Sequence, residues 1–132
     1  MKMRRGHVEP LSLQSLEILK KAAEVRGRSK YVFPSPTTWQ RPMSENTLNS
    51  ALRRLGYTSD EVVAHGFRST ASTLLNGSGK WSPDAIERAL AHTDKNEVRG
   101  IYNRSPYWRE RVELAQWWSD YLCGLGTTKV AE

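Results

Sequence analysis

The sequence predicts a mainly α-helical domain with a little β structure at its N-terminus, in the α+β class. Apolar residues recur at helical spacing in several segments, and most of these segments are bounded by residues that typically cap or stop a helix. Residues 1–11 differ, because Gly6, Val8 and Pro10 favour an extended strand or half of a β-hairpin. A chain of 132 residues is long enough for one core and too short for two.

Five segments show the helical pattern, and they cover residues 12–27, 44–56, 65–77, 81–92 and 105–123. The residues expected on their inner faces are Leu13, Leu16 and Leu19 in the first segment, Leu48 and Leu52 in the second, Phe67, Ala71, Leu74 and Leu75 in the third, Ile86 and Ala89 in the fourth, and Trp108, Val112, Ala115, Trp118 and Leu122 in the last.

Start and stop residues support these ranges. Ser12, Ser44 and Ser82 are candidate N-caps, and Pro83 stands at the first helical position after Ser82. Gly27, Gly56 and the pair Asn76-Gly77 are the expected stops. Residues 30–42 contain three prolines and should form a loop anchored by Tyr31, Val32 and Phe33, whereas residues 124–132 lack periodicity and should form a flexible tail.

Composition points to a soluble cytoplasmic protein with a polyanionic partner. No apolar run approaches the roughly 20 residues needed to cross a bilayer, and no apolar segment follows the basic start as in a secretory signal. The single cysteine, Cys123, excludes an intrachain disulfide and a thiolate metal cage. The net charge of +6 favours a nucleic acid, although a basic charge is incidental in many proteins.

His65 and Arg68 form the first candidate site. They are three residues apart near the start of a predicted helix, so they project from about the same face, beside the free N–H groups of the first turn. A phosphate group would be bound well there. The alternative is a cap-like histidine and a surface arginine, and the pair alone does not decide between them.

His92 and Tyr102 are the other candidates. His92 follows a short helix, where its imidazole either bonds a carbonyl group or reaches a site. Gly100 interrupts the helical rhythm shortly before Tyr102, whose alternative role is that of a buried tyrosine with a satisfied hydroxyl. The sequence has no phosphate-binding loop, no dinucleotide fingerprint and no histidine pair at metal-ligand spacing, so neither a metal nor a nucleotide cofactor is expected.

The segments "HGFRSTASTLLN", "AIERALAH" and "VRGIYNRSPYWRERVELAQWWSDYL" together resemble the C-terminal half of a tyrosine recombinase of the phage integrase type. The family's His-x-x-Arg box matches His65 and Arg68, its later histidine matches His92, and its nucleophile matches Tyr102. Tyr107 follows Pro106 at the start of the last helix, where a packing or surface role is expected. The order and spacing of these boxes are specific, whereas any one of them alone is not.

The N-terminus also resembles this family. "KMRRGHVEPLS" is similar to the family's β-hairpin, which carries a catalytic lysine, and the offset from Pro10 assigns that lysine to Lys2. Glu9 interrupts the family's usual Val-Pro element. The family's first active-site arginine and its DNA-binding N-terminal domains have no counterpart here, so residues 1–123 are expected to be part of a catalytic domain, and this part alone to cleave DNA poorly or not at all.

The resemblance implies a site-specific recombinase that integrates or excises a mobile element through a covalent 3′-phosphotyrosine intermediate. It also implies double-stranded DNA as partner, self-association into a tetramer on DNA, and a bacterial cytoplasmic location at the nucleoid during recombination. Five cations are candidate phosphate contacts, each of which is alternatively a solvated surface charge: Arg53, Arg54, Lys95, Arg99 and Arg104. Trp117 marks either a contact between protomers or the core.

Two other functions stay open at this point. One alternative to a recombinase is a catalytically inert DNA-binding or regulatory module derived from an integrase. The other is an unrelated helical protein-interaction domain whose charge is incidental. A covalent adduct through Tyr102 distinguishes a recombinase from an inert module, and salt-dependent DNA binding distinguishes that module from an interaction domain.

Overall fold

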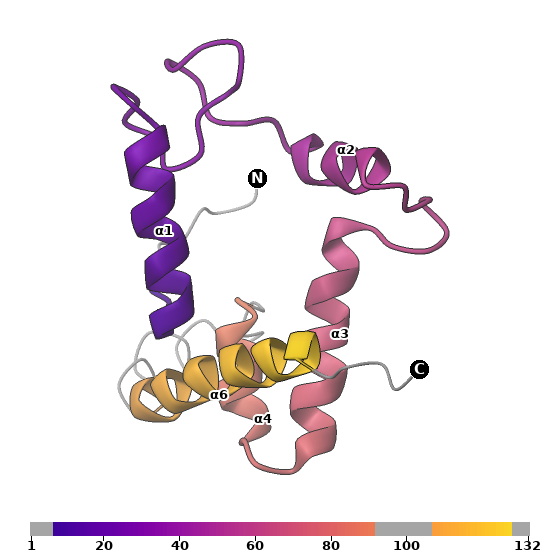
Figure 1. Cartoon of the computed structure of the whole chain (residues 1–132). Helices are drawn as coiled ribbons and strands as arrows, with labels where there is room; N and C mark the ends of the chain where they lie inside the picture. Colours follow the sequence, from indigo (N-terminus) through magenta and orange to yellow (C-terminus); the bar gives the residue numbers. More distant parts are fainter. Residues whose placement is uncertain (1–6, 92–106, 128–132) are drawn as a thin grey trace, which may run out of the picture. The chain divides into compact units, whose positions relative to one another are not determined.

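The computed structural model describes residues 7–91 and 107–127 (Figure 1). These residues form five helices, namely α1 (Leu13–Val25), α2 (Thr47–Arg54), α3 (Ala64–Ser78), α4 (Pro83–Ala89) and α6 (Trp108–Thr127). The β pairing in the described ranges is an isolated bridge between Pro34 and Pro42. The mainly α fold class is therefore confirmed. Of the predicted N-terminal hairpin, residues 7–11 form no strand, and residues 1–6 lie outside the described part.

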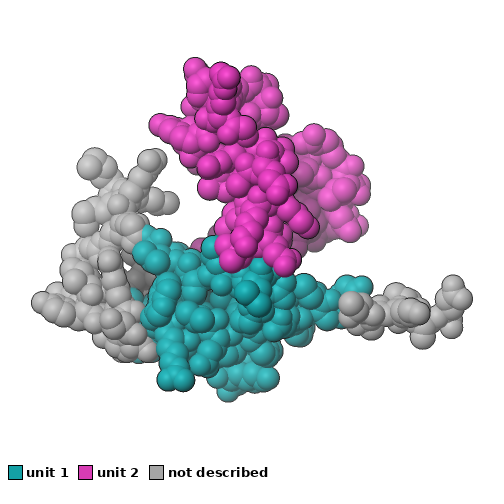
Figure 2. Space-filling view, turned by 60° about the vertical axis from the view of Figure 1, so that its left-hand side comes forward, with its two compact units in different colours: residues 1–14, 72–132 teal, residues 15–71 magenta. Residues whose placement is uncertain are grey.

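The chain divides into two compact units (Figure 2). Residues 1–14 and 72–132 form unit 1, whereas residues 15–71 form unit 2.

Helix ends follow local chemistry closely at α4. Pro83 begins this helix, and the Ser82 side chain accepts a hydrogen bond from the Ala85 N–H group, as a serine N-cap should. The predicted stop at Asn76-Gly77 is wrong, because α3 continues to Ser78 and ends before Gly79, whose φ of +67° suits glycine. The predicted start at Ser44 is also too early, since α2 begins at Thr47.

A small core holds unit 1 together. Ala85 and Ile86 of α4 are fully buried, and Leu114 of α6 is buried as well, because α4 packs against α6. Leu75, in the part of α3 that belongs to this unit, is also buried.

The predicted inner face of α6 is wrong by about one residue. Trp108, Val112 and Leu122 are exposed, whereas Arg111 and Leu114 are buried. One residue corresponds to about 100° around a helix, so the buried stripe lies beside the predicted one. An arginine occupies a buried position because its guanidinium group finds acceptors there, as described below.

Unit 2 buries less apolar surface than the sequence predicts. Helices α1 and α2 contain no buried residue, and Phe67 of α3 is 59% exposed although its helical spacing predicts an inner position. Leu74, at the unit 1 end of α3, is exposed as well. Among the described residues of unit 2, Ala71 is a buried apolar side chain.

The loop of residues 30–42 is anchored by polar contacts. Val32 and Phe33 are each 45% exposed, so their predicted anchoring role is wrong. Ser29 is buried instead, and its hydroxyl donates to the Trp39 carbonyl oxygen at 2.7 Å and accepts from the Tyr31 N–H group at 3.1 Å. A serine thus closes this loop where apolar residues were expected.

The end of the chain departs from the predicted flexible tail. Helix α6 continues through Gly124 and Gly126 to Thr127, so residues 124–127 are helical, and residues 128–132 lie outside the described part. Adding a residue to an existing helix gains a hydrogen bond without a new nucleation cost. This gain explains how a long helix runs on through residues that would not start one.

Candidate functional site

Helix α3 carries the histidine and arginine singled out in the sequence. His65 lies in its first turn and is exposed, whereas Arg68, three residues later, is half-buried. Residues at this spacing share a helix face, so the structure places the two side chains on one side of α3. Both belong to unit 2.

Some of the N–H groups that were expected to be free in this first turn have hydrogen-bond acceptors. The Ala64 N–H group donates to the Asn49 side-chain oxygen at 2.8 Å, and the Gly66 N–H group donates to the Val63 carbonyl oxygen at 2.9 Å. These two N–H groups are therefore already paired within the chain, and the His65 and Arg68 side chains lie at the same end of α3.

Helix α2 holds the start of α3 in place. Besides the contact from Asn49, the Arg53 guanidinium group donates to the Tyr57 carbonyl oxygen at 2.7 Å and also to the Val62 carbonyl oxygen. Arg53 therefore has a structural role beside its predicted DNA contact, which stays a prediction. Arg54 is exposed.

The other predicted site residues lie outside the described residues. These are Lys2, His92, Lys95, Arg99, Tyr102 and Arg104. Their roles stay predictions, and of the five predicted catalytic residues the described part of the chain contains His65 and Arg68.

Tyr107 has the packing role that its place in the sequence predicts. Its hydroxyl donates to the Asp84 carboxylate at 2.9 Å, and the Arg88 guanidinium carbon lies 5.6 Å from the centre of its ring. The Glu110 carboxylate accepts from both the N–H group and the hydroxyl of Ser82, at 2.6 and 3.0 Å. Together these contacts tie the first turn of α6 to α4.

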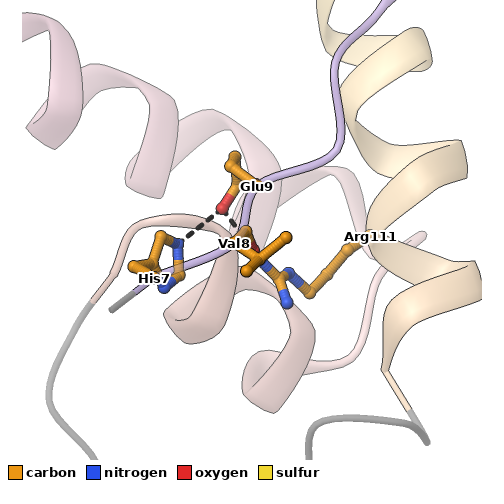
Figure 3. A network of polar contacts seen from close by, with 4 residues as sticks. All are labelled: His7, Val8, Glu9 and Arg111. Carbon is orange, nitrogen blue, oxygen red and sulfur yellow. Dashed lines mark hydrogen bonds and ion pairs between the residues drawn. The ribbon is translucent and has the colours of Figure 1, made fainter. Parts of the chain in front are cut away.

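A polar network that the sequence did not reveal connects residues 7–9 to α6 (Figure 3). Glu9 lies between two nitrogen partners: its Oε2 atom is 2.6 Å from Nε2 of His7 and 2.9 Å from Nη2 of Arg111. The same Nη2 atom donates to the Val8 carbonyl oxygen. The Arg111 side chain is only 5% exposed, so this is a buried charge with a carboxylate partner.

The contacts continue along α6 toward its C-terminal half. The Ser119 hydroxyl donates to that of Ser12 at 2.6 Å, and the Gln116 side chain accepts from the Leu13 N–H group at 2.9 Å. Gln14 donates to the Asp120 carboxylate at 2.7 Å. Residues 8–14 therefore lie along α6.

Aromatic residues form a second cluster in unit 1. The ring of Trp117 stacks on Tyr121 at 5.5 Å between centroids and meets Trp81 edge-on at 6.1 Å. Lys80 places its ammonium group 5.1 Å from the centre of the Trp117 ring. Trp117 thus packs within its own chain, which agrees with the core alternative of the two predicted for it.

The described part of the chain has neither a cluster of metal-ligating side chains nor a helix suited to a membrane. No group of three or more histidine, cysteine, aspartate or glutamate side chains is placed there to hold a metal ion. Among the same residues, no helix is both long enough and apolar enough to span a membrane.

Comparison with known proteins gives a consistent result. Residues 1–108 match the sequence profile described as the phage integrase family. The chain is 46% identical to the integrase of Enterobacteria phage P4 over 124 residues and 48% identical to the prophage integrase IntA of Escherichia coli K12 over 122 residues. It is 39% identical to the integrase of Shigella phage Sf6 over 123 residues.

Each of these matches covers 92% of the chain but only 28 to 31% of the relative. The chain therefore spans about three tenths of the length of the curated relatives it matches, and the matching region is their C-terminal part. No solved structure matches the chain.

Proposed function

The chain belongs to the phage integrase family, and we propose that it forms the C-terminal part of the catalytic domain of a tyrosine-type site-specific DNA recombinase. The observation that supports this most strongly is the order of His65, Arg68, His92 and Tyr102 within the region that matches the family. In this proposal residues 1–123 belong to the catalytic domain.

Tyr102 is the proposed nucleophile. Its phenolic oxygen attacks a DNA phosphorus atom, a P–O bond to tyrosine forms, and the bond to the 5′-oxygen of the next nucleotide breaks. The 3′-phosphotyrosine conserves the energy of the phosphodiester, so a 5′-hydroxyl group can reverse the step without ATP. The reaction thus joins strands as well as cutting them, which is what integration and excision require.

Four side chains assist this reaction in three ways. Arg68 presents a planar guanidinium group that holds two non-bridging phosphate oxygens at once, and His92 supplies a further donor. His65 accepts the tyrosine proton, since the hydroxyl, with a pKa near 10 in model peptides, must lose it during attack. Lys2 donates a proton to the leaving 5′-oxygen. These side chains supply the positive charge themselves, so we propose no cofactor.

An upstream arginine completes the proposed site in a longer chain. One such donor contributes about two to three orders of magnitude in rate. We therefore expect the 132-residue chain alone to cleave DNA poorly or not at all, and to become active when the upstream part of a recombinase precedes it.

Double-stranded DNA carrying attachment sites is the proposed partner. The net charge of +6 suits its phosphates, and Arg53, Arg54, Lys95, Arg99 and Arg104 are the proposed contacts. The complete enzyme would assemble as a tetramer on DNA, in the bacterial cytoplasm and at the nucleoid while recombination proceeds.

A hybrid protein tests this function. This chain replaces the matching C-terminal part of the phage P4 integrase, and the hybrid is incubated with nicked duplexes that carry the phage attachment core. A denaturing gel detects protein joined covalently to DNA. We expect an adduct that Tyr102→Phe abolishes and Tyr107→Phe retains.

The unmodified phage P4 integrase on the same DNA is the positive control. If that enzyme forms an adduct and the hybrid binds the core without forming one, an inert DNA-binding module is the correct description. If the 132-residue chain alone shows no salt-dependent binding to duplex DNA, it is an interaction domain of another kind; the chain is tested alone here because the upstream part of the phage enzyme could itself bind DNA in the hybrid.

A further inference from the structure

Glu9 interrupts the Val-Pro element of the family that this chain resembles. In the structure its carboxylate forms an ion pair with Arg111 of α6. We propose that the Glu9–Arg111 ion pair is a positioning device, which holds the N-terminal segment that leads to Lys2 against the first turns of α6. The inference rests on the proposed function, because Lys2 is the proposed acid for the leaving 5′-oxygen.

The pair is suited to this role by its burial. The Arg111 side chain is 5% exposed, whereas the Glu9 side chain is 37% exposed. A buried guanidinium group is costly without a counter-charge and hydrogen-bond acceptors, and the Glu9 carboxylate and the Val8 carbonyl oxygen supply these to the Nη2 atom of Arg111, whereas its Nε atom has no partner among the described residues. Arg111, on α6, is the more buried member of the pair, so it is the one that most requires a counter-charge. The segment that carries the Glu9 carboxylate is therefore held against α6.

The position of the pair along the chain decides what it controls. Among the described residues, the contacts of Arg111 with Glu9 and with the Val8 carbonyl oxygen are the ties to α6 nearest to Lys2 in sequence, Glu9 being seven residues away, and the next ones begin at Ser12. If loss of the Glu9 carboxylate also releases the Val8 carbonyl oxygen from Arg111, the first described contact with α6 is at Ser12, ten residues from Lys2. The effective concentration of a tethered group falls roughly as the −3/2 power of tether length, which gives about a twofold loss here.

A further loss comes from direction. The guanidinium group of Arg111 binds both the backbone carbonyl oxygen of Val8 and the side-chain carboxylate of Glu9. These two contacts fix the direction of the segment as well as its distance from α6. Positioning a general acid contributes about 10² to 10⁴ in rate. We expect Glu9→Gln, which keeps the size of the side chain, to slow strand cleavage about fivefold to tenfold.

A change in the leaving group tests whether this effect passes through the acid. In a duplex whose 5′-bridging oxygen is replaced by sulfur, the tyrosine oxygen forms the same bond to phosphorus, and the P–S bond breaks to release a thiolate. A thiol has a pKa of about 8.5, far below that of an alcohol, so its leaving requires no proton donor. The sulfur substrate should therefore restore the rate of Glu9→Gln and of Lys2→Ala to within about twofold of the unsubstituted hybrid.

The experiment uses the hybrid recombinase, with single-turnover rates measured on oxygen-bridged and sulfur-bridged duplexes. Arg109→Gln is the matched control, because Arg109 lies two residues from Arg111 on the same helix but is 93% exposed and pairs only with Glu113 among the contacts of the described residues. Arg111→Gln is a second test, since it removes the positive charge that pairs with Glu9, and it should behave as Glu9→Gln does. Circular dichroism of each variant checks the fold.

Each outcome is decisive. Slow cleavage of the oxygen substrate with recovery on sulfur supports the positioning role. Equal slowing on both substrates means that the pair only stabilises the fold, and unchanged rates mean that it positions nothing; either result overturns the inference while leaving the recombinase function intact. If the unsubstituted hybrid forms no adduct with either duplex, the proposed function itself fails.

Discussion

Replacing Ile86 by alanine should destabilise unit 1 by about 3 kcal/mol. The Ile86 side chain is fully buried in α4, where the helix packs against α6. The substitution removes three carbon atoms, whose transfer from water contributes about 0.8 kcal/mol each, or roughly 2.4 kcal/mol. Incomplete collapse around the cavity adds to this, and measured Ile→Ala costs in protein cores are about 2 to 5 kcal/mol. Alanine's higher helix propensity offsets a few tenths.

Urea denaturation followed by tryptophan fluorescence measures the change. Four of the five tryptophans belong to unit 1, so the signal reports mainly on the unit that contains Ile86. The midpoint should fall with little change in slope.

Ile18→Ala is the matched control, since it makes the same chemical change on α1 at a side chain that is 61% exposed. We expect it to cost less than about 1 kcal/mol. An Ile18→Ala cost equal to or above that of Ile86→Ala would refute the reasoning, because burial would then not determine the loss.

Three further changes test other contacts. Ser82→Ala removes the N-cap of α4 and a donor to Glu110, and should lower the free energy of unfolding by about 1 to 2 kcal/mol; a loss below 0.3 kcal/mol in urea denaturation would contradict the capping role. Tyr107→Phe removes the hydrogen bond to Asp84 and should cost about 1 kcal/mol in the same assay, while the hybrid retains adduct formation; loss of the adduct would make Tyr107 more than a packing residue. Arg54→Gln should reduce the slope of log binding constant against log salt by about one in a titration with duplex DNA; an unchanged slope would remove Arg54 from the interface.

The helices could be predicted from the sequence because their signals are local. Ser82 and Pro83 mark the start of α4 whatever surrounds them, and the structure confirms both positions. Glycines likewise mark the ends of α1 and α2, since Gly27 and Gly56 follow them with positive φ. A local backbone preference needs no knowledge of tertiary contacts.

The buried faces could not be predicted as well, because burial depends on what packs against a helix. Periodicity treats Arg111 as a surface residue, although Glu9, 102 residues away in sequence, makes its burial favourable. In the same way, Phe67 has the spacing of an inner residue and is nevertheless exposed. Partners that are distant in sequence decide such cases, and one chain alone does not reveal them.

The candidate site likewise has one feature that local sequence predicts and other features that it does not. The helical spacing of His65 and Arg68 correctly predicts one shared face of α3. Their supports, Asn49 and Arg53 on α2, had no recognisable sequence signal, since contacts to backbone atoms leave no motif. The sequence marked Arg53 by its charge alone, as a candidate phosphate contact.

The most direct test of the central claim is to identify the residue that becomes attached to DNA. The adduct formed by the hybrid recombinase is digested with nuclease and trypsin, and the peptide that retains a nucleotide is sequenced by mass spectrometry. Cleavage after Arg99, Arg104 and Arg109 places Tyr102 and Tyr107 in different peptides, residues 100–104 and 105–109. We predict a nucleotide on Tyr102 in the peptide of residues 100–104. A nucleotide on Tyr107, or on any other residue, would contradict the assignment of Tyr102 as the nucleophile.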